Sequence, residues 1–176
     1  MDFLRALSLV SEFLERLGFS YGVVGAFALQ SYGLARATQD VDFVTEAAGR
    51  DKLVAFLEAQ GYETLHVSSG YSNHLHPEPA KGRLDVVYVD GETGRKLFAG
   101  CEVRSVGAGV RLPVPRPEHL AAMKALAMKN DPGRTLQEMA DVRFLLGLPG
   151  VDRDEIEAYF RRYGLNQRFD EIAEGS

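Results

Sequence analysis

The stretch VVGAFALQSYGLARATQDVDF, residues 23–43, combines a chain break at a glycine with a pair of aspartates. A β-prone run ends at Gly25, and residues of helical composition follow it. Asp40 and Asp42 flank the start of a second β-prone run, Val41–Thr45. Side chains two residues apart on a strand point to the same face, so both carboxylates can reach one pair of ions. Converging carboxylates suit Mg²⁺, and the stretch predicts a strand, a glycine turn, a helix and an acidic strand.

The aspartate pair alone is more typical of a solvated strand end than of a metal site, so the glycine turn before it matters. A helix that begins at this turn offers free N–H groups and a positive dipole to a phosphate. Gly25 lets the backbone approach a ligand closely, and the small side chain of Ala26 keeps that approach clear. The alternative is a tight turn needed only for packing.

A third carboxylate, Asp85, interrupts the apolar run Leu84–Val89, which we expect to be a strand of the same sheet. An unpaired carboxylate is costly to bury, and a bound cation or a basic partner would compensate its charge. The alternatives are that Asp85 faces solvent or pairs with Arg83. Asp90, at the end of the run, is more typical of a turn.

The remaining pattern predicts one α+β core, residues 1–114, and a C-terminal helical subdomain, residues 115–176, packed on it. The boundary is marked by Pro113, Pro115 and Pro117. Further predicted elements of the core are helices at Phe3–Leu17, Ala26–Tyr32 and Asp51–Gln60, strands at Tyr21–Val24 and Tyr62–Val67, a loop at Ser68–Lys81, and a hairpin of Glu102–Val106 and Val110–Val114 around Gly107–Gly109. Helices are predicted at Glu118–Lys129, Thr135–Leu146 and Asp154–Tyr163, followed by a frayed tail of about ten residues.

Composition narrows the classes of function. The 176 residues carry a formal net charge of −5, which argues against a general nucleic-acid binder. Cys101 is the single cysteine, so redox chemistry and an intrachain disulfide are not expected, and a reducing cytoplasm suits the chain. No apolar run approaches the roughly 18 to 20 residues that span a bilayer, and the amphipathic start is unlike a signal peptide.

The residues quoted above resemble the DNA polymerase β-type nucleotidyltransferase superfamily, particularly its AbiEii-like branch of toxins and uncharacterised bacterial nucleotidyltransferases. The signature of that group is a hydrophobic strand, Gly-Gly or Gly-Ser, a helix, often Arg-x-Thr, and then Asp-x-Asp. Here Val24-Gly25-Ala26 is followed by thirteen residues, Phe27 to Gln39, and Arg36-Ala-Thr38-Gln directly precedes Asp40-Val-Asp42. Ala26 departs from the signature, because it replaces the second Gly or Ser.

Two helical motifs extend the resemblance to about Tyr21–Leu146. The branch has a Leu-x-x-x-Lys helix and then an Asp-x-x-Asp helix; Leu120–Lys124 matches the first, and Glu138–Asp141 matches the second with Glu replacing one Asp. The resemblance implies a nucleotidyltransferase fold, a mixed β-sheet flanked by helices with a C-terminal helical bundle. It also implies that Lys124 neutralises charge on the leaving pyrophosphate; the alternative is an exposed helix lysine.

The activity implied by the resemblance is transfer of a nucleoside monophosphate from a nucleoside triphosphate, with Mg²⁺ or Mn²⁺ held by Asp40, Asp42 and Asp85. Gly25, Ala26 and Arg36 would orient the phosphates, and Thr38 would cap or position the loop. The acceptor is open between RNA, protein and a small molecule, and a toxin with a cognate antitoxin is one implied role. The rivals are a non-catalytic nucleotide- or protein-binding module with this fold and a metal-dependent phosphoesterase.

Two other groups of residues are weaker candidates. His74 and His76 alternate in the predicted loop and could bind Zn²⁺ with Glu78, although mobility over the cleft fits the loop better. The basic and aromatic residues Arg161, Arg162, Tyr163 and Arg168 fit either a phosphate-binding patch or a solvated helix end.

Overall fold

The computed structural model describes residues 2–107 and 109–174. The chain divides into two compact units, Met1–Pro115 and Arg116–Ser176. Across the described ranges, no helix combines the length and the apolar character needed to cross a membrane.

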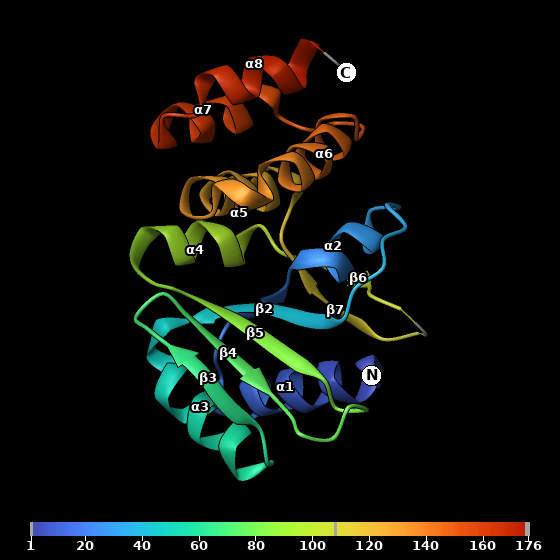
Figure 1. Ribbon diagram of the computed structural model, residues 1–176, viewed down its shortest axis with the longest axis vertical. Helices are drawn as coiled ribbons and strands as arrows, with labels where there is room; N and C mark the ends of the chain where they lie inside the picture. Colours follow the sequence, from blue (N-terminus) through green and yellow to red (C-terminus); the bar gives the residue numbers. More distant parts are fainter. Residues whose placement is uncertain (1, 108, 175–176) are drawn as a thin grey trace. The chain divides into compact units, whose positions relative to one another are not determined.

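The first unit is built on a five-stranded mixed sheet (Figure 1), which confirms the predicted α+β class. The strand order is β1-β2-β5-β4-β3, in which β2 and β5 are parallel and the other neighbours are antiparallel. The elements are α1 (Phe3–Leu17), β1 (Tyr21–Val23), α2 (Gly25–Ser31), β2 (Asp40–Glu46), the 3₁₀ helix η1 (Ala47–Gly49), α3 (Arg50–Ala59), β3 (Glu63–Val67), β4 (Tyr71–Leu75), β5 (Arg83–Val89), α4 (Gly91–Ala99), β6 (Glu102–Ser105) and β7 (Arg111–Val114).

The first helix ends where the sequence predicts, at Gly18, which adopts the left-handed conformation with φ of +71°. At its other end the Asp2 side chain accepts a hydrogen bond from the Arg5 backbone N–H. The apolar face of α1 is buried through Leu7, Val10 and Leu14. In Figure 1, α1 and α3 lie on one side of the sheet and α2 lies on the other.

Alternation along the two central strands separates the core from the polar face. Val41 pairs with Leu84 and Phe43 with Val86, and all four side chains are buried. The intervening aspartates therefore project from the opposite face. This alternation was readable in the sequence, because the apolar members of both strands are strongly β-prone.

The predicted loop Ser68–Lys81 was wrong in its first half, which contains the strand β4. The side chains that β4 buries are Ser72 and His74, so the strand shows no apolar alternation in the sequence. The Ser72 hydroxyl lies 2.7 Å from the Tyr88 hydroxyl and 2.8 Å from His74 Nε2. Hydrogen bonds thus satisfy polar groups that would otherwise exclude this segment from a core.

Of two further features of the first unit, one was predicted from the sequence and the other was not. The hairpin is confirmed as β6 and β7, which pair antiparallel, although Ala108 of its predicted turn lies outside the described residues. The helix α4 was not predicted, because it is short and includes Gly91 and Gly94.

The regular elements of the second unit are all helical, and they include two that the sequence did not predict, η2 and α8. Its elements are α5 (Pro117–Asn130), the 3₁₀ helix η2 (Pro132–Arg134), α6 (Thr135–Leu146), α7 (Arg153–Tyr163) and α8 (Asn166–Glu174). The predicted frayed tail is wrong, since α8 buries Phe169 and Ile172. The Phe169 ring lies 5.5 Å from that of Phe160 in α7, and this contact makes a short, polar-looking segment part of the core.

Candidate active site

Three carboxylates converge at the start of the parallel strand pair. Asp40 and Asp42 belong to β2, and Asp85 lies directly beside Asp42 on β5 in the parallel register. One carboxylate oxygen from each residue can be chosen so that all three lie within 4.8 Å of one another. The three residues are half-buried, and no other such group of His, Cys, Asp or Glu occurs in the ranges 2–107 and 109–174.

This oxygen set fits a divalent cation. An ion that binds oxygens at about 2.1 Å holds them no more than about 4.2 Å apart, so small side-chain rotations would close the aspartates around it. Like-charged carboxylates at this spacing repel each other, and a bound cation would remove the repulsion. The geometry therefore suits Mg²⁺ or Mn²⁺, while the identity of the ion stays a prediction.

Gly25 lies against the carboxylate of Asp42. Its φ of +61° is a conformation that residues with a side chain adopt rarely. A Cβ at this position would stand 2.0 Å from Asp42 Oδ2. The Val24 N–H also donates to the Asp42 carbonyl at 3.0 Å, so the turn into α2 is fixed on the acidic strand. Glycine is therefore required at position 25 for two reasons: the backbone has a positive φ, and the Asp42 carboxylate leaves no room for a Cβ.

Thr38 holds the first aspartate of the pair. Its hydroxyl lies 2.5 Å from Asp40 Oδ1 and accepts a hydrogen bond from the Asp40 backbone N–H at 3.3 Å. Both contacts are local, so the Thr-x-Asp spacing alone arranges them. Thr38 fixes the direction of one Asp40 oxygen and the start of β2.

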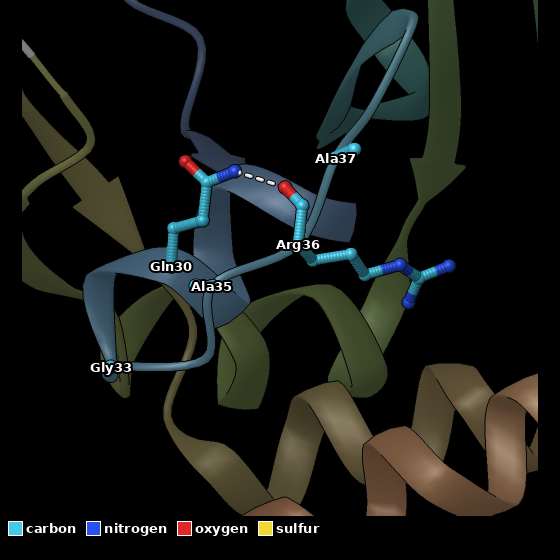
Figure 2. Close-up of a pocket in the computed structure, with 5 residues that line it drawn as sticks. All are labelled: Gln30, Gly33, Ala35, Arg36 and Ala37. Atoms are coloured by element: carbon cyan, nitrogen blue, oxygen red, sulfur yellow. Dashed lines mark hydrogen bonds between the residues drawn. The ribbon is translucent and has the colours of Figure 1, made fainter.

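Arg36 and Ala26, the other predicted phosphate-binding residues of this unit, occupy the loop and the helix around the aspartates. The Arg36 carbonyl accepts a hydrogen bond of 2.6 Å from Gln30 Nε2 (Figure 2), which ties the loop to α2. Figure 2 also shows the Arg36 guanidinium extending away from Gln30. Gln30 and Arg36 line an open hollow of about 590 Å³. Ala26 is buried in the first turn of α2.

Two neighbours of Asp85 complete the polar face. Arg83 Nε donates to Asp85 Oδ1 at 2.8 Å, and Asn73 Nδ2 donates to the same oxygen at 2.9 Å. The pairing with Arg83, considered from the sequence as an alternative to a metal site, coexists with the aspartate cluster. Asn73 was missed because it lies on β4, where a loop was predicted.

The three carboxylates also influence the protonation of Arg83. The hydrogen bond to Asp85, together with the charges of Asp85, Asp40 and Asp42, raises the pKa of Arg83 above its ordinary value. Arg83 is therefore a permanent positive charge beside the three carboxylates.

The two histidines considered as zinc ligands are engaged elsewhere. His74 is fully buried, with Nδ1 lying 3.2 Å from the Thr64 hydroxyl and Nε2 near Ser72. The His76 Nδ1 accepts a hydrogen bond from the Glu78 backbone N–H. Burial lowers the pKa of His74, so this imidazole is neutral near pH 7.

Lys124 lies in the second unit, where the two helical motifs seen in the sequence meet. Its ammonium group contacts Glu138 at 2.7 Å and Asp141 at 2.8 Å. Arg134 binds the other oxygen of Glu138 at 2.8 Å. The Lys124 side chain is 12% exposed and that of Glu138 fully buried, so the lysine is not the exposed helix residue considered above. Its proposed role on the pyrophosphate stays a prediction.

Comparison with known proteins identifies the fold. No protein-family model and no curated protein sequence matches the chain. Among solved structures, the antibiotic-resistance factor ANT(2'')-Ia is similar with a TM-score of 0.66 at 14% identity, covering 99% of this chain and 98% of that one. The lincomycin-bound lincosamide adenylyltransferase LnuA matches with a TM-score of 0.54 at 16% identity, over 81% and 96% of the chains. A nucleotidyltransferase-like protein from Paracoccidioides brasiliensis matches with a TM-score of 0.54 at 13% identity, over 96% and 91%. The chain thus has the nucleotidyltransferase fold.

Proposed function

We propose that the chain is a metal-dependent nucleotidyltransferase, which moves a nucleoside monophosphate from a nucleoside triphosphate to an acceptor hydroxyl and releases pyrophosphate. The observation that carries this proposal is the convergence of Asp40, Asp42 and Asp85 within 4.8 Å on one face of the sheet. The nucleotidyltransferase fold supports it, because adenylyltransferases share this architecture.

Each residue of the site has a distinct task in this reaction. Asp40 and Asp42 would hold two ions jointly, and Asp85 would hold the ion beside the acceptor. Bound divalent ions supply charge stabilisation on the entering and leaving oxygens and lower the pKa of the attacking hydroxyl. Thr38 keeps one Asp40 oxygen in place, and Gly25 keeps Asp42 accessible at the turn.

The triphosphate would lie on the side of the Gly25 turn and the residue 33–39 loop. Its phosphates would approach the backbone at Gly25 and Ala26, with the Arg36 guanidinium as a counter-charge. Placing the α-phosphorus and the acceptor oxygen in line is the main contribution expected of these residues, because displacement at phosphorus depends on positioning. Lys124 would contribute charge to the leaving group if substrate draws it from its carboxylate partners.

Among the acceptors left open by the sequence, we favour a small molecule with a free hydroxyl. The net charge of −5 disfavours an RNA acceptor. Two of the similar structures concern antibiotics, one an antibiotic-resistance factor and the other a lincosamide adenylyltransferase with bound lincomycin. A protein acceptor and a toxin with a cognate antitoxin are the alternatives; the toxin predicts growth arrest on expression that depends on Asp40.

The test is transfer of label from nucleoside triphosphates. The full chain is incubated with each α-³²P-labelled NTP, Mg²⁺ or Mn²⁺, and either a panel of hydroxylated small molecules, including aminoglycosides and lincosamides, or total RNA or lysate. Labelled product with release of pyrophosphate is expected, and Asp40→Asn with Asp42→Asn should abolish it.

Two results would refute the proposal in favour of a rival. Metal-dependent NTP binding with no transfer to any acceptor class would favour the non-catalytic binding module, for which the replacement at Ala26 is the motivating feature. Release of phosphate without nucleotidyl transfer would favour the phosphoesterase.

A further inference from the structure

The face of the sheet that carries the aspartates continues beyond them across β4 and β3. Residues that are register partners on neighbouring strands project from the same face of a sheet. Four such partners form one row across this face: Asp42, Asp85, Asn73 and His66. The row leads from the candidate active site to the edge strand β3.

A β-bulge places His66 at the end of this row. Thr64 pairs with His74, whose side chain is buried on the opposite face, and the register shifts between Thr64 and His66. Without this shift, Leu65 would pair with Asn73, and His66 would turn towards the opposite face. The extra residue in β3 therefore puts an imidazole, in place of an aliphatic side chain, on the face that carries the aspartates.

Aromatic and aliphatic groups flank Asn73 on this face. Tyr71, Asn73 and Leu75 alternate along β4, so they share the face and successive Cα atoms lie about 7 Å apart. The Tyr71 ring stacks on the His66 ring, with centroids 4.5 Å apart and an interplanar angle of 19°. Tyr71 is 47% exposed and Leu75 is 41% exposed. The face thus offers two stacked rings and an aliphatic side chain to a ligand.

Asn73 connects these groups to the carboxylate cluster. Its Nδ2 donates to Asp85 Oδ1 at 2.9 Å, and the two residues are paired across β4 and β5, with Cα atoms about 5 Å apart. Asp85 is the residue assigned above to the ion beside the acceptor. A molecule whose hydroxyl reaches that ion can therefore extend over Asn73 onto Tyr71 and Leu75.

The exposed groups favour one class of acceptor. Flat aromatic rings and a leucine side chain attract the apolar C–H face of another ring. A linear polyol presents hydroxyls in every direction and loses more conformational freedom when it binds. A ring that carries the reacting hydroxyl on its edge would lie flat on this surface without burying its polar groups.

We propose that His66, Tyr71 and Leu75 form an acceptor surface, and that the acceptor is a hydroxylated ring compound with an apolar or aromatic face. Tyr71 and Leu75 contact the acceptor, and His66 is a positioning residue that holds the Tyr71 ring. The inference rests on the proposed function, since it concerns the acceptor of the same reaction. It narrows that acceptor to ring compounds and excludes linear polyols.

The test is saturation-transfer NMR on the full chain with Mg²⁺ and the α,β-methylene analogue of ATP. The probe is phenyl β-D-glucopyranoside, and sorbitol at the same concentration represents the linear polyols. Wild type should bind the probe and give no signal with sorbitol. Tyr71→Ala should weaken probe binding about tenfold, the order of one lost ring contact. Tyr71→Phe, which keeps the ring, should restore most of this loss, and His66→Ala should weaken binding severalfold.

A matched control is available for the leucine. Leu75 and Leu17 are both 41% exposed, but Leu17 ends α1, which lies on the opposite side of the sheet (Figure 1). Leu75→Ser should weaken probe binding severalfold, whereas Leu17→Ser should leave it unchanged. Calorimetry with the ATP analogue should give the same nucleotide affinity for every variant, and thermal unfolding shows that each is folded.

The transfer assay gives a second measurement of the same surface. With any ring compound that wild type labels, Tyr71→Ala should raise the KM for the acceptor about tenfold and leave the KM for the nucleoside triphosphate unchanged. A purely structural role for Tyr71 would raise both constants together and would overturn its contact with the acceptor.

The outcomes separate the acceptor surface from the function on which it rests. No binding of the probe by wild type, equal binding of sorbitol, an unchanged affinity in Tyr71→Ala, or equal losses in Leu17→Ser and Leu75→Ser would overturn the surface. Probe binding with the expected variant effects, but no nucleotidyl transfer to any acceptor class, would support the surface and refute the proposed function.

Discussion

The two units each contain a cluster of charged side chains, and the two clusters differ in burial and in how their charges are arranged. In the helical unit, Lys124 and Arg134 are joined to Glu138 and Asp141, two cations with two anions, and Glu138 is fully buried. In the sheet, three half-buried aspartates bring carboxylate oxygens within 4.8 Å of one another, and Arg83 contacts Asp85. A balanced cluster can be buried without help, whereas an excess of one sign calls for ions from solution. We therefore expect the helical cluster to maintain the fold and the aspartate cluster to bind cations.

The largest effect is expected when two of the three clustered aspartates lose their negative charge. Asp40→Asn with Asp42→Asn should reduce nucleotidyl transfer by at least about 10³-fold, because the proposed shared metal ligands are lost. The metal-free protein should unfold at an equal or higher temperature, since repulsion is relieved. Activity assays and calorimetry measure the two effects. Asp90→Asn, an exposed aspartate beyond β5, is the control; a clear loss of metal-free stability in the double variant would contradict the contrast.

The charged cluster of the helical unit should instead lose folding stability when one of its charges is removed. Lys124→Met leaves the buried Glu138 with Arg134 alone, and breaking a buried ion pair costs about 3 kcal/mol or more. Urea unfolding measures this loss of stability. Lys129→Met, on the same helix beside the Tyr163 ring, should cost less than about 1 kcal/mol. Equal stability of the two variants would show that the helical cluster does not maintain the fold.

A smaller effect is expected from filling the narrow space between the Gly25 turn and Asp42. Gly25→Ala should cost about 2 kcal/mol and weaken Mn²⁺ binding, because the new Cβ would displace the Asp42 carboxylate. Gly18→Ala separates strain from displacement: Gly18 has a similar φ of +71°, but a Cβ there meets nothing within 4 Å. This control should lose about 1 kcal/mol of stability and keep its Mn²⁺ affinity. Normal Mn²⁺ binding by Gly25→Ala would contradict the close approach.

The smallest effect concerns a third polar group, the neutral network around His74 on the buried face of the sheet. Burial lowers the pKa of His74 in the folded chain, so below about pH 6.5 the unfolded chain binds more protons. Stability should therefore decrease, by about 1 kcal/mol, as the pH falls from 7.5 towards 5.5. Urea midpoints across this range should show a smaller decrease for His74→Gln than for wild type. The exposed His66→Gln should retain the wild-type dependence.

The sequence predicted features whose signal is local. The spacing of Asp40 and Asp42, the break at Gly25 and the apolar surroundings of Asp85 each need only a few neighbouring residues to be recognised. It could not predict β4, because the residues that this strand buries are Ser72 and His74, and their burial depends on partners elsewhere in the sheet. Asn73 was not predicted as a site residue, because it lies on that strand.

The helical unit shows the same limit. Helical residue patterns between strong breakers, Asp131-Pro-Gly and Leu148-Pro-Gly, were sufficient to predict α5 and α6, and the motifs marked Lys124 and Glu138. That these residues bind each other is a matter of how the helices pack, which no local pattern encodes. The helix α8 was interpreted as a tail because its two buried apolar residues, Phe169 and Ile172, form too short a pattern to predict a helix. Their burial depends on contacts with other helices of the unit, such as that of Phe169 with Phe160.

The parallel pairing of β2 with β5 has a consequence for folding kinetics. Asp42 and Asp85 are register partners although the whole of α3, β3 and β4 separates them along the chain. Closing such a long connection is slow, so the complete carboxylate set arises only once this pairing exists. Divalent ions would then bind the assembled sheet in preference to earlier states. Such binding would prolong the lifetime of the native chain by slowing its unfolding, with little acceleration of its folding.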